Sequence, residues 1–176
     1  MERLISVVKK DLRDWRDLAP LEGLCKIVDV YDGDTCWAAI DLANPSLNPD
    51  IRDSNIKKVN IRIARINAPE IKGGTETTRA SARASRDFAR SLLLGKIIRF
   101  RFGNFGLING ESLDCYHRQI AELYILNDDF IKTTLKDLSA KLIVGGSNLI
   151  PSNTEYINFS DIMLLSGNAE LYQPKD

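Results

Sequence analysis

The chain has little of what several large classes of enzyme and secreted protein require. Its 176 residues include one histidine and three cysteines. The cysteines, Cys25, Cys36 and Cys115, are odd in number and lack CxxC spacing, which argues against a disulfide framework and against a zinc site. A serine or cysteine hydrolase is disfavoured too, because the only histidine is His117 and the sequence has no Gly-x-Ser-x-Gly turn.

Excess charge and long apolar runs are also missing. The formal net charge is zero, so overall charge gives no support for nucleic-acid binding, which would need local clusters of basic residues. Residues 1–11 are too charged for a signal peptide, and no apolar run approaches membrane-spanning length. With 44% hydrophobic and 27% charged residues, we expect an intracellular, soluble protein with one domain and a sizeable core.

Hydrophobic periodicity divides the chain into three parts. Residues 1–20 have apolar side chains at helical spacing and predict an amphipathic helix that packs on the main domain or on a partner. Residues 21–150 predict the main domain, and residues 151–176 a mostly polar tail in which Ser160 could cap a short helix. The main domain is expected to contain strands at 25–31, 35–42, 59–66, 96–102 and 119–126 and helices at 77–94 and 130–144.

The stretch from Val59 to Glu70 contains the first candidate site. Its apolar residues alternate with polar ones, which predicts a half-buried strand with Arg62 on the side away from the apolar set. Pro69 ends the strand, because it lacks an N–H group and restricts the residue before it. An arginine on a strand, a kinked exit and the Glu70 carboxylate could hold a cation and a phosphate, although an ordinary strand with surface charges has the same pattern.

Two further features carry charge that a function could use. Asp34 lies in an Asp-Gly-Asp turn, where its oxygens could bind a cation, although Asp-Gly turns are common in hairpins. The expected helix at 77–94 places four arginines in one narrow sector, which is typical either of a solvated face or of a footprint for a phosphate backbone. These arginines are Arg79, Arg83, Arg86 and Arg90, and the opposite face, with Ala80, Ala84, Phe88 and Leu92, is expected to be buried.

Three separate motifs, in this order, resemble those of the staphylococcal nuclease (thermonuclease) family. They are Asp32-Gly33-Asp34-Thr35, the strand from Arg62 to Asn67-Ala68-Pro69-Glu70, and Asp114-Cys115-Tyr116-His117-Arg118. The resemblance covers roughly residues 23–146. It implies an α+β protein with an OB-fold, which is a five-stranded β-barrel, and about three helices, here preceded by the N-terminal helical extension.

The resemblance also implies a chemical role for each matching residue. Phosphodiester hydrolysis must neutralise the negative charge that builds up as water attacks, and a hard cation with oxygen ligands plus two guanidinium groups does so directly. The residues implied are Asp34, Asn67 and the Ala68 carbonyl for Ca²⁺, Glu70 for orienting or deprotonating the attacking water, and Arg62 and Arg118 for the scissile phosphate. Tyr116 and the four helix arginines are the candidates for binding nucleic acid.

Two positions depart from the family pattern. Asn67 stands where the family usually has aspartate, so the metal site loses one negative charge. Charges in contact attract by about 1 kcal/mol even in water, and we therefore expect calcium to bind more weakly by roughly tenfold or more. His117 stands where the family has glycine and could shift Arg118 slightly, because it tolerates a left-handed turn less well.

Two functions remain open at this point. The first is a Ca²⁺-dependent endonuclease that hydrolyses phosphodiester bonds of DNA and RNA with little sequence specificity. The second is a catalytically weakened module on the same fold that binds nucleic acid or a protein partner without cleavage, which Asn67, the neutral net charge and the N-terminal helix would suit. Glu70 together with Arg118 favours the enzyme, because a binding module needs no carboxylate beside a bound phosphate.

Overall fold

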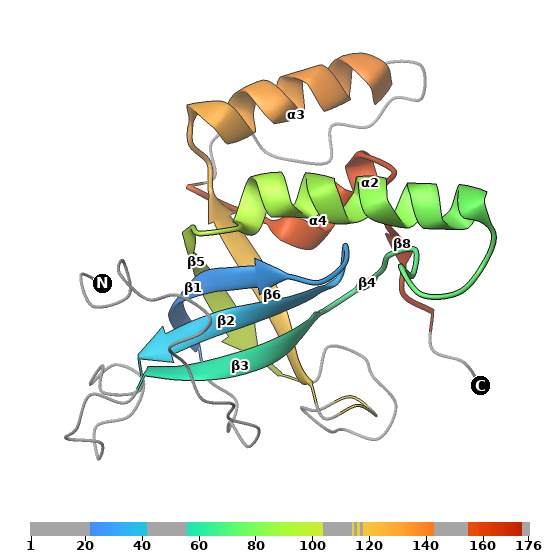
Figure 1. The fold of residues 1–176 in the computed structure, drawn as a ribbon. Coiled ribbons are helices and arrows are strands. Elements are labelled where there is room, and N and C mark those ends of the chain that lie inside the picture. Colours follow the sequence, from blue (N-terminus) through green and yellow to red (C-terminus); the bar gives the residue numbers. More distant parts are fainter. Residues whose placement is uncertain are drawn as a thin grey trace.

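Five strands of the chain close into a mixed β-barrel (Figure 1). The computed structural model describes residues 22–41, 56–103, 114, 116, 118–142 and 155–173; the helix expected at 1–20 lies outside them. Neighbouring strands pair antiparallel in the order β3-β2-β1-β5-β6, and a parallel pairing of β3 with β6 closes the barrel. This arrangement confirms the α+β class and the OB-fold. The barrel strands are β1 (Glu22–Val30), β2 (Thr35–Asp41), β3 (Ile56–Ile63), β5 (Ile97–Phe102) and β6 (Gln119–Leu126).

The barrel interior is filled by apolar side chains that alternate along the strands. Ile61, Phe100 and Leu123, from three different strands, are all fully buried there. Each such side chain stabilises the fold by about 1.5–3 kcal/mol relative to its exposed state. Cys25 and Cys36 are buried free thiols in the same core, and burial raises the pKa of both well above the ordinary value.

Three helices of the described ranges lie around the barrel: α2 (Glu76–Leu93), α3 (Asp129–Leu142) and α4 (Phe159–Leu165). The Thr75 side chain caps α2 by accepting a hydrogen bond from the Thr78 amide (3.3 Å). In Figure 1, α2 and α4 lie over one end of the barrel, and α3 lies beyond them. Within the described ranges, no helix is long and apolar enough to cross a membrane.

The buried face of α2 differs from the one expected from the sequence. Ala80 and Ala84 are exposed, whereas Leu92 is buried as expected. The expectation was wrong because alanine loses little when it remains exposed, so its position on the helix indicates the buried face only weakly. The residues that α2 buries are Ala82, Ser85, Ala89, Leu92 and Leu93.

The C-terminal segment belongs to the domain core over its described part. The sequence predicted a polar tail beyond residue 150, but β7 (Tyr156–Asn158) extends the sheet by pairing with β6, and Phe159 is fully buried. Asn158, rather than Ser160, caps α4: its side chain accepts a hydrogen bond from the Ser160 amide (2.9 Å). The chain then ends its described course in β8 (Glu170–Leu171), which pairs antiparallel with β4 (Ile66–Asn67).

Candidate functional site

A pocket of about 290 Å³ opens where the start of β2, the end of β3, strand β4 and the C-terminal segment meet. The structure brings the predicted catalytic and metal-binding residues together on its walls, although they come from three separate parts of the sequence. Their mutual positions follow from the barrel, because the pairing of β2 with β3 and of β3 with β6 places the three motifs side by side. The predicted residues that line the pocket are Asp34, Arg62, Asn67, Ala68, Glu70, Tyr116 and Arg118.

Asp34 is buried at the turn between β1 and β2 and ties that turn to the segment after β4. Its Oδ2 accepts a hydrogen bond from the Ala68 amide (2.7 Å), and its Oδ1 accepts one from the Thr35 hydroxyl (3.0 Å). Gly33 allows this close approach, since a Cβ there would lie 2.1 Å from the Ser85 hydroxyl oxygen and 2.7 Å from the Ala68 Cβ. A substitution at Gly33 would therefore force the turn away from its contact with Ala68.

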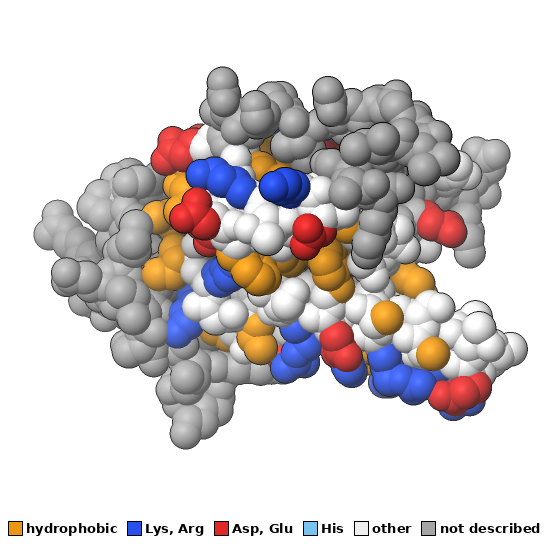
Figure 2. Space-filling model, turned by 90° about the horizontal axis from the view of Figure 1, so that it is seen from above, with side chains coloured by type: hydrophobic (Ala, Val, Ile, Leu, Met, Phe, Trp, Pro, Cys, Tyr) orange, Lys and Arg blue, Asp and Glu red, His pale blue; other side chains and the backbone are white. Residues whose placement is uncertain are grey.

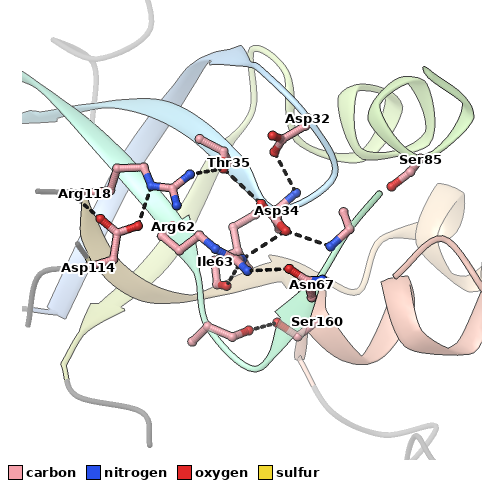
Figure 3. A network of polar contacts seen from close by, with 12 residues as sticks. Asp32, Asp34, Thr35, Arg62, Ile63, Asn67, Ser85, Asp114, Arg118 and Ser160 are labelled. Carbon is pink, nitrogen blue, oxygen red and sulfur yellow. Dashed lines mark hydrogen bonds and ion pairs between the residues drawn. The ribbon is translucent and has the colours of Figure 1, made fainter. Parts of the chain in front are cut away.

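Arg62, near the end of β3, is nine-tenths buried and has several polar partners (Figure 3). Its Nη1 donates to the Ile63 carbonyl (2.9 Å) and lies 3.2 Å from Asp34 Oδ2. Its Nη2 donates to the side-chain oxygen of Asn67 (3.3 Å), and its guanidinium lies over the Tyr172 ring, 5.8 Å from the centroid. A buried charge needs such partners, because removing them would leave it uncompensated in a poorly solvated site.

Arg118 lines the pocket and contacts Thr35, next to the turn that contains Asp34. Its Nε donates to Asp114 Oδ2 (2.5 Å), and its Nη1 donates to the Thr35 hydroxyl (2.9 Å), which in turn donates to Asp34. The backbone amides of Arg118 and Tyr116 both donate to Asp114 Oδ1 (2.8 and 3.0 Å). Thr35 thus links the two arginines through Asp34, as Figure 3 shows. His117, which was expected to shift Arg118, lies outside the described residues.

Two carboxylates in the pocket have no arginine partner among the residues that the structure describes. Glu70 is exposed just past Pro69 and makes no hydrogen bond or ion pair within those ranges. Burial, and then repulsion from Asp34, raises the pKa of Asp32 to about 6. The pocket walls carry four carboxyl groups and three guanidinium groups, a formal charge of −1 when all are ionised. A phosphodiester entering this pocket would therefore meet a net repulsion unless a cation came with it.

The donor set suits a cation that binds together with a phosphate better than one held by the protein alone. Within the described parts of the chain, no three histidine, cysteine, aspartate or glutamate side chains are grouped closely enough to hold a metal ion. Asp34 Oδ2 and Asn67 Oδ1 both contact the guanidinium of Arg62, so a cation held by these oxygens would lie next to that positive charge. Calcium takes six to eight oxygen ligands, so one carboxylate, one amide oxygen and the Ala68 carbonyl would need water and phosphate oxygens to complete the shell.

The arginine stripe on α2 is present, but much of its charge is balanced locally. Arg79 and Arg83 both pair with Glu76 (3.5 and 2.6 Å). None of the four stripe arginines lines the pocket. On the face shown in Figure 2, basic and acidic side chains are interspersed over the described surface rather than gathered into one basic area. The remaining contacts of the stripe join Arg86 to Asp87 (2.8 Å) and Arg90 to Asp29 (3.8 Å) and to the Val30 carbonyl (3.2 Å).

Sequence reasoning missed two residues of the pocket wall, Arg65 and Tyr172. Arg65 occupies the turn between β3 and β4, and its side chain pairs with Asp161 of α4 (2.9 Å). Tyr172 follows β8, and its amide donates to the Arg65 carbonyl (2.8 Å). Nothing in the local sequence pattern connects these residues, because their proximity depends on the pairing of β4 with β8, more than a hundred positions apart.

Comparison of the chain with protein-family models and with curated protein sequences finds no match. The chemical capacity of the pocket follows from its geometry. One guanidinium contacts the buried Asp34 carboxylate directly and another is linked to it through Thr35, and the Glu70 carboxylate, without a partner among the described residues, lines the same pocket. Such an arrangement can bind a phosphate group and place a general base beside it.

Proposed function

We propose that the chain is a divalent-cation-dependent phosphodiesterase of the staphylococcal nuclease type, an endonuclease that hydrolyses DNA and RNA with little sequence specificity. The observation that carries this proposal is that Arg62, Arg118 and Glu70 line one pocket, and that Glu70 has no partner among the residues the structure describes. In the reaction, a water oxygen bonds to phosphorus, the bond to one ester oxygen breaks, and negative charge builds up on the non-bridging oxygens.

Arg118 is the group best placed to stabilise that charge. Two of the five guanidinium N–H groups are used, on Asp114 and Thr35, which leaves three available to phosphate oxygens. Its partners hold the guanidinium plane before substrate arrives, so little reorganisation accompanies the reaction. Arg62 is more heavily committed to Asp34, the Ile63 carbonyl and Asn67, and it would contribute mainly a fixed positive charge at the base of the pocket.

Glu70 would act on the attacking water. Its exposed carboxylate has no competing hydrogen bond among the described residues, so it can accept a proton from a water molecule beside a bound phosphate. Pro69 fixes the backbone immediately before it. Glu70 takes one proton from the attacking water, and the departing ester oxygen takes up a proton from solvent water and leaves as a hydroxyl group.

Asp34, Asn67 and the Ala68 carbonyl would hold the divalent cation, with calcium as the ion that the sequence resemblance implies. Such an ion supplies positive charge that offsets both the pocket carboxylates and the phosphate. Asn67 brings no charge of its own, so the ion depends more on Asp34 and on the substrate phosphate than it would with an aspartate at this position.

A binding module without cleavage is the second candidate function. The observation that favours it is the contact of Arg62 with both Asp34 and Asn67, which satisfies these oxygens internally and makes a cation less necessary for folding of the site. A binding module of this kind would hold nucleic acid with a salt-sensitive affinity but would leave it uncut.

Cleavage of a labelled single-stranded oligonucleotide in millimolar calcium or in chelator separates the two functions. The informative variants are Glu70→Gln and, as a matched control, Glu155→Gln, which removes an exposed carboxylate outside the pocket. We expect calcium-dependent cleavage by the wild type and Glu155→Gln, and a rate lower by roughly a hundredfold or more in Glu70→Gln. Binding without cleavage by the wild type would favour the second function. Equal rates in the two variants would remove Glu70 from the mechanism.

A further inference from the structure

The pocket has a second wall whose chemistry the proposed reaction does not use. It consists of Arg65, from the turn between β3 and β4, and Tyr172, after β8. The Tyr172 amide donates to the Arg65 carbonyl (2.8 Å), which fixes the two residues side by side although they are distant in sequence. Figure 1 shows β4 and β8 as neighbours at the edge of the barrel, consistent with the pairing of Asn67 with Glu170.

The backbone of Arg65 is held in an unfavourable conformation. Its φ of 70° makes it the one non-glycine residue of the described ranges in the left-handed region. An arginine gains nothing from this conformation, which glycine or asparagine adopts more readily. The surrounding structure enforces it, because the Ser160 hydroxyl donates to the Ala64 carbonyl (2.8 Å) and Tyr172 binds the next carbonyl. Residues kept in such conformations are concentrated at binding and catalytic sites.

The ion pair that the Arg65 guanidinium forms is partly exposed to solvent. Its partner is Asp161, and both side chains are more than a third exposed (39% and 35%), whereas the Arg62–Asp34 pair is almost entirely buried. An ion pair between partly exposed groups is weak, since water and salt screen it. A phosphate offers bidentate, charge-assisted hydrogen bonds to a guanidinium and can compete with such a partner.

Tyr172 supplies an aromatic surface to the same pocket. Its ring lines the pocket, is partly exposed, and lies under the Arg62 guanidinium at 5.8 Å. Its hydroxyl makes no hydrogen bond to any described residue. A tyrosine ring at the wall of a phosphate-binding pocket can stack an unpaired nucleobase, whatever the identity of the base.

We propose that Arg65 and Tyr172 form a nucleotide subsite next to the reacting phosphate, in which Arg65 binds a neighbouring phosphate and Tyr172 stacks an unpaired base. This inference rests on the proposed function for its choice of ligand. It adds a chemical requirement: the preferred ligand is a single strand that extends at least one nucleotide beyond the phosphodiester that is cut.

Oligonucleotide binding tests this subsite independently of cleavage. The probes are a fluorescently labelled deoxythymidine dinucleotide and hexanucleotide, titrated in calcium and at several salt concentrations with a Glu70→Gln background. Arg65→Asn removes the guanidinium but tolerates the left-handed backbone. Asp161→Asn is the matched control, because it breaks the same ion pair and leaves Arg65 in place. Tyr172→Leu removes the ring, and Tyr172→Phe keeps it.

We expect Arg65→Asn to weaken hexanucleotide binding by roughly tenfold, the loss of one charge-assisted contact. The slope of log affinity against log salt should fall by about 0.7 in magnitude, which corresponds to one phosphate of a single strand. Asp161→Asn should leave affinity unchanged or raise it. Tyr172→Leu should weaken binding by roughly fivefold or more, and Tyr172→Phe should not. Dinucleotide binding should change little in any variant.

Equal losses in Arg65→Asn and Asp161→Asn would overturn the subsite, because they would show that the ion pair only stabilises the fold. Unchanged hexanucleotide affinity in both Arg65→Asn and Tyr172→Leu would overturn it as well. These results are separable from the proposed function. A wild type that binds the hexanucleotide through these residues but never cuts would refute the nuclease and leave the subsite, and the reverse pattern would leave only the nuclease.

Discussion

The two walls of the pocket differ in how the fold holds them. The wall formed by the barrel, with Asp34, Arg62 and Arg118, is largely buried, and each side chain has several partners fixed by strand pairing. The C-terminal wall, with Arg65 and Tyr172, is more exposed and is attached through backbone hydrogen bonds and one partly exposed ion pair. Groups that must be in place before a reaction suit the first wall, and groups that exchange partners on binding suit the second.

The loss of an arginine should therefore affect stability and activity differently on the two walls. A guanidinium on the barrel wall neutralises carboxylates that are largely buried, so its removal disturbs both the fold and the chemistry. A guanidinium on the C-terminal wall already faces solvent, so its removal should affect binding and leave the fold nearly intact. The following changes test this difference, from the largest expected effect to the smallest.

Arg118→Lys should reduce the turnover number for oligonucleotide cleavage by roughly a thousandfold. Lysine keeps the positive charge but lacks the planar fork that reaches Asp114, Thr35 and phosphate together. The measurement is kcat under saturating substrate, with circular dichroism to confirm that the variant is folded. A decrease of less than tenfold would show that Arg118 serves to hold Asp114 in place and does not act on the phosphate.

Arg62→Gln and Arg65→Gln form a matched pair for stability. Arg62→Gln leaves the buried Asp34 carboxylate without its counter-charge and should lower the free energy of unfolding by about 3 kcal/mol. Arg65→Gln should lower it by less than about 1 kcal/mol, because its ion pair is partly exposed. Urea unfolding of both variants measures the difference. Similar losses in the two variants would contradict the distinction between the walls.

Asn67→Asp should tighten calcium binding by roughly tenfold, because it adds a negative charge to the pocket wall that Asp34 also lines. Isothermal titration of the nucleic-acid-free protein with calcium gives the affinity directly. Ser91→Asp, on the exposed face of α2, controls for the effect of one added charge on the whole protein. An equal change in both variants would show that Asn67 lies outside the cation site.

Asp32→Asn should raise the free energy of unfolding by about 1 kcal/mol at neutral pH and above. In the folded protein the pKa of Asp32 is raised to about 6 from an ordinary value of 3.8, so its ionisation opposes folding. This opposition is complete above about pH 6 and absent below about pH 4. Partial exposure of the carboxyl keeps the effect below the roughly 3 kcal/mol that a two-unit shift would give. Thermal unfolding of both proteins across this pH range should show the advantage of the variant disappearing towards acid.

The residues of the barrel wall could be predicted from the sequence because they lie in strands and motifs with a local pattern. The alternation at Val59, Ile61 and Ile63 reveals a strand, and the expected strand at 119–126 agrees with β6. The order of three motifs then indicated which charged residues share a site, and Arg62, Glu70 and Arg118 do line one pocket. The sequence could not predict the hydrogen bond from Arg62 to Asn67, because that contact depends on side-chain geometry at the kink.

The C-terminal wall could not be predicted from the sequence, because it depends on contacts between residues that are far apart in the chain. The segment after 150 is mostly polar in sequence, and its apolar core residues are few: Ile157, Phe159, Ile162, Met163 and Ala169. The pairing of β4 with β8 involves two residues on each side, too few to leave a periodic pattern. The left-handed backbone of Arg65 has no counterpart in its sequence, since arginine is an uncommon residue for that conformation.

Single-turnover cleavage of one labelled single-stranded oligonucleotide tests the central claim most directly. With enzyme in excess, the wild type should cut in calcium and stop when chelator is added, and Glu70→Gln should cut at least a hundredfold more slowly while binding the oligonucleotide equally well. No calcium-dependent cleavage by the wild type, at an enzyme concentration that binds all of the oligonucleotide, would contradict the account and leave a binding module in its place.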